Sequence, residues 1–315
     1  MARFQFTLAF ERHESEMNEV VAKQNSSKGI GMLKARQQTY AWATTLQILQ
    51  LIAGVLVPIT ASISALIYPC TRPYLASLAL LVLILDIAFI DRWMSKFIRQ
   101  AAKLSELFDC YVLELEWNEF VAGEEPTPES VSFAASKFSS SANAVGKLMN
   151  WYPVSVGRAP IHIARLACQR TNLWYDAELR RRYSDWVVVI PLLIVAVFFA
   201  VGLGANLLFS ELVLAIAVPL TPLLIWSIRE HFRHRDTAAS QQALRASADA
   251  LMKSVKSGPV VVSDLEAKSR EFQDAIYLRR RANPLVFPVV YSLLRNDMER
   301  DMNAGAEELL ERMGY

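Results

Sequence analysis

Four apolar runs, each about as long as a membrane-spanning helix, limit the folds that this chain can adopt. They lie at about residues 44–67, 74–90, 186–209 and 212–228. A helix needs roughly 20 apolar residues to cross the hydrocarbon core of a bilayer. Only a few residues separate the two runs of each pair, so each pair should form an antiparallel hairpin. We therefore predict an all-α membrane protein with four transmembrane helices in two hairpins, whose long helices extend into a helical cytoplasmic domain.

The composition indicates a protein with both membrane and cytoplasmic parts. Of the 315 residues, 53% are hydrophobic and 20% are charged, which is too apolar for most soluble proteins and too charged for a chain embedded throughout. The net charge of +2 predicts no bulk attraction to nucleic acid, so we expect no direct binding of DNA or RNA. Cys70, Cys110 and Cys168 are scattered and form neither a disulfide framework nor a zinc-binding spacing.

Lysine and arginine residues near the ends of the apolar runs predict the orientation of the chain. Arg72 is alone on one side, whereas basic clusters such as the one at 180–182 lie on the other side. Such residues accumulate on the cytoplasmic side of membrane proteins, so both termini should be cytoplasmic. A long charged segment precedes the first run, which argues against a cleaved signal peptide. The predicted segments are cytoplasmic 1–43, hairpin 44–91, cytoplasmic helical 92–185, hairpin 186–228 and cytoplasmic helical 229–315.

Several helices are expected to continue beyond the apolar runs. From Met94 to Leu115, apolar residues recur three and four positions apart, which is a heptad pattern. This pattern predicts that the second span extends as a stalk of roughly 70 Å, at about 1.5 Å per residue. The stalk should end at the glycine and proline residues of 123–128. The fourth span should continue to about residue 257, further helices are predicted at 129–149, 264–282 and after Pro288, and loops are predicted at 24–29 and 151–160.

Residues 172–186 form the joint between the cytoplasmic part and the third span. If they are helical, Asp176 lies four residues before Arg180, the order that favours an intrahelical ion pair. Trp186 lies where an interfacial aromatic residue would lie. One aromatic and aliphatic face of this helix is formed by Tyr175, Leu179, Tyr183 and Trp186.

Two runs of three arginines allow two interpretations. The run at 180–182 suits the edge of a span, where each basic residue near anionic lipid contributes about 1 kcal/mol. It also suits a phosphate site, because guanidinium groups pair with phosphate and aromatic neighbours stack on bases. The run at 279–281 lies far from any span, so lipid explains it less well. The candidate phosphate and base ligands are Arg170, Asn172, Trp174, Tyr175, Arg180, Arg181, Arg182, Arg279, Arg280 and Arg281.

Small and polar residues recur every three or four positions along the first span. Such a stripe either packs against another helix or lines water. Asp86 lies inside the second span, where burying a carboxylate costs about 2.5–3.5 kcal/mol. It either marks an ion path or a partnered site, or it reaches with Asp91 toward the cytoplasmic surface. The candidate pore or gating residues are Gln47, Gln50, Gly54, Pro58, Asp86 and Asp91.

Catalytic motifs are missing from the sequence, so we expect a protein that is not an enzyme. No glycine-rich phosphate loop, nucleophile elbow or His-Glu-x-x-His motif occurs. His231 and His234 lie three residues apart beside Asp236, but a typical metal site would need further ligands. The alternative for this pair is a solvated basic helix face, and we predict no metal site and no cofactor.

Short motifs along the chain resemble those of a known family. They are LKARQQTY at 33–40, the joint QRTNLWYDAELRRRY at 169–183, the two hairpins and the tail YSLLRNDMERDMN at 291–303. Together they resemble the SMODS-associated four-transmembrane effectors of bacterial anti-phage signalling through cyclic oligonucleotides (CBASS and related systems). Members of that family carry a tryptophan directly before the aspartate, whereas Tyr175 intervenes here. The motifs carry no catalytic chemistry, and no ligand residue is transferred from the family.

The resemblance implies a multi-pass effector of the bacterial inner membrane that a cyclic oligonucleotide regulates and that damages the membrane when active. Four helices of one chain enclose no useful channel, so a pore would require a homo-oligomer in the lipid bilayer. The alternative is a signalling or scaffold protein whose Met94–Leu115 stripe docks a cytoplasmic partner. A small transporter is a third possibility, which the few polar residues at mid-membrane depth disfavour.

Overall fold

The computed structural model describes residues 18–258 and 261–315, and within these ranges the chain is helical, without a β-strand. The predicted all-α class is confirmed, and residues 1–17 of the predicted N-terminal segment lie outside the described residues. The elements up to residue 158 are α2 (Val20–Asn25), α3 (Ser27–Ile67), η1 (Pro69–Thr71), α4 (Arg72–Leu85), η2 (Asp86–Ile90), α5 (Asp91–Leu113), α6 (Glu119–Ala122), α7 (Pro128–Ser136), α8 (Ala142–Gly146) and η3 (Val154–Arg158). The elements after it are α9 (Ile161–Gly204), α10 (Phe209–Leu212), η4 (Val213–Ala217), α11 (Val218–Ser257), α12 (Val262–Ala282) and α13 (Pro288–Met313).

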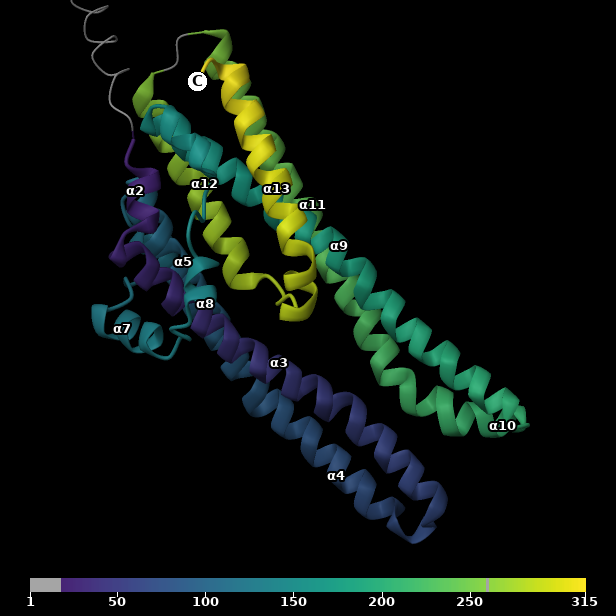
Figure 1. Cartoon of the computed structure of the whole chain (residues 1–315). Helices are drawn as coiled ribbons and strands as arrows, with labels where there is room; N and C mark the ends of the chain where they lie inside the picture. The colour runs from purple at the N-terminus through teal and green to yellow at the C-terminus, as the bar shows by residue number, and fades with distance from the viewer. Residues whose placement is uncertain (1–17, 259–260) are drawn as a thin grey trace, which may run out of the picture.

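Two long helical hairpins extend from a helical body (Figure 1). One hairpin is formed by the C-terminal part of α3 with α4, and the other by the C-terminal part of α9 with α10 and the start of α11. Both hairpin tips lie far from the end of the body that holds the C-terminus. The two predicted hairpins are therefore present as helical units, each continuous with helices of the body.

A single-residue break at Ser26 replaces the predicted loop at 24–29. Ser26 has extended backbone angles, and its hydroxyl accepts a hydrogen bond from the backbone N–H of Gly29 at 3.1 Å. This is N-terminal capping, so α3 begins at Ser27. Gly29 is needed there because a Cβ atom would lie 2.4 Å from the carbonyl oxygen of Lys23. The polar and glycine residues that suggested a loop serve instead as a cap and a close helix contact.

The second hairpin helix continues into the body, as the heptad pattern predicts. Helices α4, η2 and α5 follow one another from Arg72 to Leu113, and η2 is one π-helical turn within them. The stalk ends about ten residues earlier than predicted, at Glu114, which has a φ of 54°. The reason is Arg165 of α9, which donates to the carbonyl oxygens of Leu113 at 2.6 Å and Glu114 at 2.8 Å. These carbonyls would otherwise lack partners at the helix end.

Residues 129–149 form two short helices, α7 and α8, so the single helix predicted there is wrong. The serine run between them provides the break. Ser141 is the N-cap of α8 and accepts a hydrogen bond from the backbone N–H of Ala144 at 3.2 Å. Serine side chains compete for backbone groups in this way and favour caps over helix interiors.

The heptad stripe of α5 packs inside the chain. Ala101, Leu104 and Phe108 are buried, and α5 lies against α3 and α12. The main core of the body joins Phe108 to Leu33, Leu166 and other apolar residues of α3, α9, α11 and α13. The central part of the stripe is therefore covered by this chain, which removes most of the surface proposed for docking a partner.

Apolar side chains are exposed along both hairpins. On α9 these include Leu192, Leu193, Val197 and Val201, and on α4 they include Leu80. Large exposed apolar surfaces are typical of contact with membrane or protein. Among the described residues, α9 is the one helix long and apolar enough to cross a bilayer. The four-span arrangement therefore remains a prediction.

Candidate functional site

Arg180, a predicted phosphate ligand, is buried at the joint between the body and the second hairpin. Its guanidinium donates to Asp176 Oδ2 at 2.9 Å and to the carbonyl oxygen of Pro284 at 2.8 Å. The predicted ion pair with Asp176 is thus confirmed, and despite burial it holds the pKa of that carboxyl below its usual value. Arg180 ties α9 to the connection between α12 and α13, so it is not free for an external ligand.

His234 of α11 completes this contact. Arg180 Nη1 lies 3.2 Å from His234 Nδ1, and because a guanidinium only donates, Nδ1 must be the unprotonated nitrogen of a neutral ring. Nε2 lies 3.3 Å from Glu230 Oε1. Burial lowers the pKa of His234, only partly offset by Glu230. His231 has a separate partner, since its Nδ1 lies 2.9 Å from the carbonyl oxygen of Ser184. Among the described residues, no group of three or more metal-ligating side chains forms.

The other arginines of the first run pair with a carboxylate on their own helix. Arg181 and Arg182 both donate to Glu178, at 2.7 Å and 2.6 Å. Of the predicted aromatic and aliphatic face, Leu179 and Tyr183 are buried, whereas Trp186 is 49% exposed. Arg181 and Arg182 therefore stabilise the helix and present a paired basic surface.

The second arginine run divides among three environments. Arg279 donates to Ser240 Oγ at 3.0 Å, and Arg281 lines a cavity described below. Arg280 pairs with Asp109, a buried carboxylate that also accepts from Tyr152 at 2.6 Å and belongs to α5. The predicted phosphate site at 279–281 is therefore not assembled, because Arg280 holds α12 against α5.

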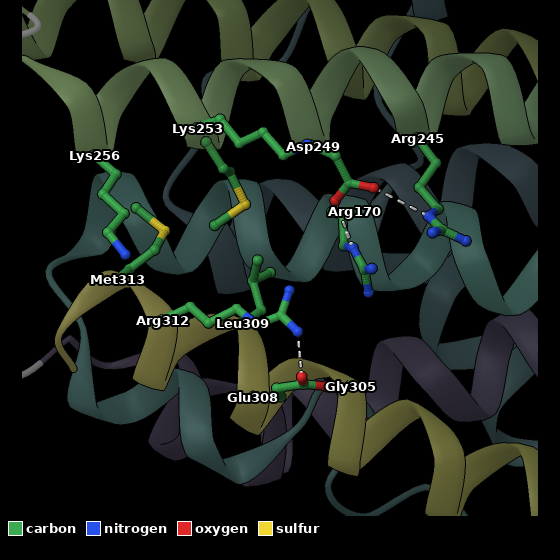
Figure 2. Close-up of a pocket in the computed structure, with 11 residues that line it drawn as sticks. Arg170, Arg245, Asp249, Lys253, Lys256, Gly305, Glu308, Leu309, Arg312 and Met313 are labelled. Carbon is green, nitrogen blue, oxygen red and sulfur yellow. Dashed lines mark hydrogen bonds and ion pairs between the residues drawn. The ribbon is translucent and has the colours of Figure 1, made fainter.

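A basic cleft of about 430 Å³ lies between α9, α11 and α13 (Figure 2). Asp249 of α11 accepts from Arg170 at 2.9 Å and from Arg245 at 3.3 Å. The basic groups exceed the acidic groups in the lining, and Lys253 and Lys256 are exposed. The residues with charged side chains that line this basic cleft are Arg170, Arg245, Asp249, Lys253, Lys256, Glu308 and Arg312.

Of the predicted ligand residues, only Arg170 lies in the basic cleft. The other basic residues of the cleft were missed, although a signal existed. Residues 245, 249, 253 and 256 recur at spacings of four, four and three, which places them on one helix face. The contribution of Arg312 could not be read in this way, because it depends on how α13 packs beside α9.

A second space, which we call the aromatic cavity, lies between α9, α13 and residues 147–152. Its volume is about 260 Å³. It contains two predicted ligand residues, Asn172 and Tyr175, whereas Trp174 is not in its lining. The family-like tail contributes Tyr291 and Arg295 from α13. The sequence motifs at 169–183 and 291–303 are thus adjacent in space, a pairing that no spacing rule would have found.

Most of the predicted gating residues meet in an inter-hairpin cavity of about 580 Å³ between α3, the α4–α5 helix and α11. Gln50 Nε2 donates to Asp86 Oδ2 at 3.1 Å, and Asp86 begins the π-helical turn η2. Asp86 Oδ1 and Gln47 Oε1 are buried without a hydrogen-bond partner. Buried acceptors without partners are rare and point to water or another donor in the cavity. The predicted residues in the lining are Gln47, Gln50, Gly54, Asp86 and Asp91, and the side chain of Pro58 is outside the described residues.

Comparison with known proteins identifies the family. The "SMODS-associating 4TM effector domain" matches residues 18–309. The chain belongs to this family. It is also 24% identical, over 278 residues, to a probable CBASS effector molecule of Bacillus cereus (strain VD146), and the alignment covers 85% of this chain and 90% of that protein. No solved structure matches. Membership of this 4TM family indicates a membrane protein and confirms the family resemblance seen in the motifs.

The first prediction compares an arginine that pairs with a buried carboxylate of α5 with a neighbouring arginine that does not. Arg280→Ala should lower the free energy of unfolding by about 3 kcal/mol, because it leaves the buried Asp109 carboxylate without its ion partner. Arg279→Ala, on the same helix turn, should change it by less than about 1 kcal/mol, because among the described residues Arg279 bonds to Ser240 and to its own helix. Denaturant unfolding of the detergent-solubilised proteins would measure both, and equal effects would contradict the assignment.

The second prediction concerns pH. His234 is neutral in the folded protein, and its folded pKa lies below the unfolded value of about 6.5. The unfolded chain therefore binds the proton first, and stability should fall as the pH drops below about 6.5, by up to about 1.4 kcal/mol per pH unit. Thermal unfolding of the wild type and His234→Gln between pH 8 and 5 would measure this. The variant should lack this component, and parallel profiles would refute it.

Proposed function

We propose that the chain is a CBASS effector of the bacterial inner membrane, which a cyclic oligonucleotide switches and which permeabilises the membrane when active. The effector role follows from the family, and the relative in Bacillus cereus carries a corresponding name. The observation that carries the mechanism is the continuity of α9 and α11. Both helices line the basic cleft, and both run without interruption into the second hairpin.

The basic cleft suits a ligand with more than one phosphate group. Its five basic side chains face two carboxylates, so the lining has a surplus of positive charge. In this structure Asp249 forms ion pairs with both Arg170 and Arg245. A phosphate would compete with Asp249 for these guanidinium groups, since charge-assisted pairs with phosphate are strong. Binding would thereby change the contact between α9 and α11, and Arg312 would draw α13 toward the ligand.

Such a change can reach the hairpins because the connecting elements are single helices. A ligand shifts a conformational equilibrium only through contacts that differ between the two states. Here the differing contacts are those of Asp249, which lies on α11 and pairs with α9. Re-packing of α9 against α11 would move the second hairpin relative to the first, and so change the inter-hairpin cavity that contains Asp86.

The permeable state would be a homo-oligomer with both termini in the cytoplasm and four spans per chain. The apolar residues exposed on α4 and α9 offer surface for lipid and for neighbouring copies. Gln47, Gln50 and Asp86 would supply polar lining close to the membrane. No catalytic step and no cofactor is needed in this mechanism. Docking of a partner through α5 is less favoured, because its central stripe is buried.

The third prediction tests the proposed switch. Lys253→Glu combined with Lys256→Glu should abolish messenger-dependent dye uptake in cells that co-express a cyclic-oligonucleotide synthase. It should also weaken messenger binding by at least about tenfold, since each charge-assisted hydrogen bond contributes about 1.5–3 kcal/mol. Lys268→Glu, an exposed lysine on α12, is the matched control. Unchanged permeability of wild-type cells with and without the messenger would refute the proposal.

The fourth prediction tests the polar lining. Asp86→Asn keeps the size of the side chain and removes its charge, so it should preserve messenger binding and alter the ion selectivity or conductance of the protein in planar bilayers. Asp185→Asn removes an exposed carboxylate near the second hairpin and should leave the conductance unchanged. If Asp86→Asn behaves like Asp185→Asn, the inter-hairpin cavity is not part of the ion path.

A further inference from the structure

The aromatic cavity has features of a binding site that the proposed switch does not use. It lies between α9, α13 and the segment at 147–152, and it contacts α13 at residues 291–303, whereas the basic cleft is lined by residues 305–313 of that helix. Four of its lining residues are aromatic: Trp151, Tyr152, Tyr175 and Tyr291. Trp151 is held from one side by Arg36, whose guanidinium lies 4.4 Å from the ring centroid. Fixed aromatic walls of this kind suit a flat, ring-shaped ligand.

Two polar atoms on one turn of α9, in residues that line this cavity, lack hydrogen-bond partners. Thr171 Oγ1 and Asn172 Nδ2 are each buried and have no hydrogen-bond partner, whereas the hydroxyl of Tyr175 interacts with Tyr291, another residue of the lining. Leaving a buried polar atom unpaired costs about 1–3 kcal/mol, and such atoms are rare in folded proteins. Two of them on adjacent residues in the lining of one cavity therefore indicate a polar occupant. That occupant must accept hydrogen bonds, because Asn172 Nδ2 can only donate.

The volume of the aromatic cavity and the side-chain amide of Asn172 indicate which class of ligand would fit. The volume of about 260 Å³ is below the range of about 300–1,000 Å³ that is usual for whole drug-sized ligands, so the cavity fits one part of a larger molecule. A nucleobase is flat and carries both donors and acceptors. A side-chain amide pairs in a bidentate manner with the N6 and N7 edge of adenine, whereas guanine is better matched by arginine or lysine.

Positive charge is available for the rest of a nucleotide. Lys147 is exposed at the lining, and Arg295 donates to Glu299 and to the carbonyl oxygen of Lys147, each at 2.5 Å. A sugar-phosphate attached to a base in the cavity could therefore contact Lys147, which lines the same cavity. We propose that the aromatic cavity binds the adenine base of a nucleotide, with Asn172 reading the base edge and the aromatic side chains stacking on it.

This inference goes beyond the proposed function and does not require the bound nucleotide to be the regulatory ligand. The base could belong to a free adenine nucleotide or to a cyclic oligonucleotide, and both contain the same chemistry. The test uses both sources. Equilibrium dialysis of the full-length protein in nanodiscs would compare AMP, cyclic di-AMP and GMP as probes.

The fifth prediction is that an adenine probe binds in preference to GMP and that Asn172→Asp weakens its binding by about tenfold or more, because the amide donors are lost. Tyr175→Phe keeps the ring, removes only the hydroxyl, and should reduce binding several-fold. Asn296→Asp, at an exposed position of α13, is the matched control and should bind as the wild type does. Thermal unfolding of each variant would confirm that it is folded.

Several outcomes would contradict the proposal that the aromatic cavity binds adenine. They are the absence of binding by both adenine probes, equal binding of GMP, and equal binding by Asn172→Asp and the wild type. Binding of cyclic di-AMP without AMP, if lost in Asn172→Asp, would support the pocket and identify the cyclic source. If Lys253→Glu combined with Lys256→Glu abolishes the permeability response and Asn172→Asp does not change nucleotide binding, the switch stands and base binding in the aromatic cavity is refuted. Retained adenine binding without any permeability response would support the adenine site in the aromatic cavity and refute the proposed switch.

Discussion

The buried guanidinium of Arg180 is the contact on which the junction between body and hairpin depends. It connects Asp176 of α9, His234 of α11 and the carbonyl oxygen of Pro284 before α13. Asp176 also accepts from Gln241 at 2.8 Å, which adds a second link between α9 and α11. A buried charge is tolerated only when it is paired and hydrogen-bonded, so these segments must keep their positions together. The helices that leave the body at this level are therefore fixed relative to one another.

This constraint divides the arginines of the chain into two groups with different roles. Arg165, Arg180 and Arg280 are inside, where they satisfy carbonyl oxygens and carboxylates of distant segments. Removing any of them would leave an unpaired buried group. Arg170 and Arg245 share one partly exposed carboxylate at the rim of a cleft, and an external anion could take its place. The same residue type thus stabilises the body in one group and offers exchangeable contacts in the other.

Helix periodicity was sufficient to predict most of the helices. It failed where a helix end or a side-chain partner depends on residues far away in the sequence. The continuous α4–α5 and α11 helices follow from apolar spacing, which depends on near neighbours in the chain. The end of α5 depends on Arg165, 52 residues away, so no local pattern could locate it. The gating stripe could be recognised because i and i+3 neighbours share a helix face. The phosphate candidates could not be ranked, since a row of arginines carries no information about which carboxylate each one meets.

The distribution of contacts explains how a signal in the body could act on the hairpins. Helix α11 packs along α9, and α3 packs along α5, whereas the two hairpins meet each other mainly through α3 and α11. The inter-hairpin cavity lies along this weaker boundary and retains unpaired acceptors of Gln47 and Asp86. Rearranging the boundary therefore costs fewer packed contacts than rearranging either helix pair. A change in the α9–α11 contact at Asp249 would be expected to move whole hairpins, because the helices that carry it remain intact.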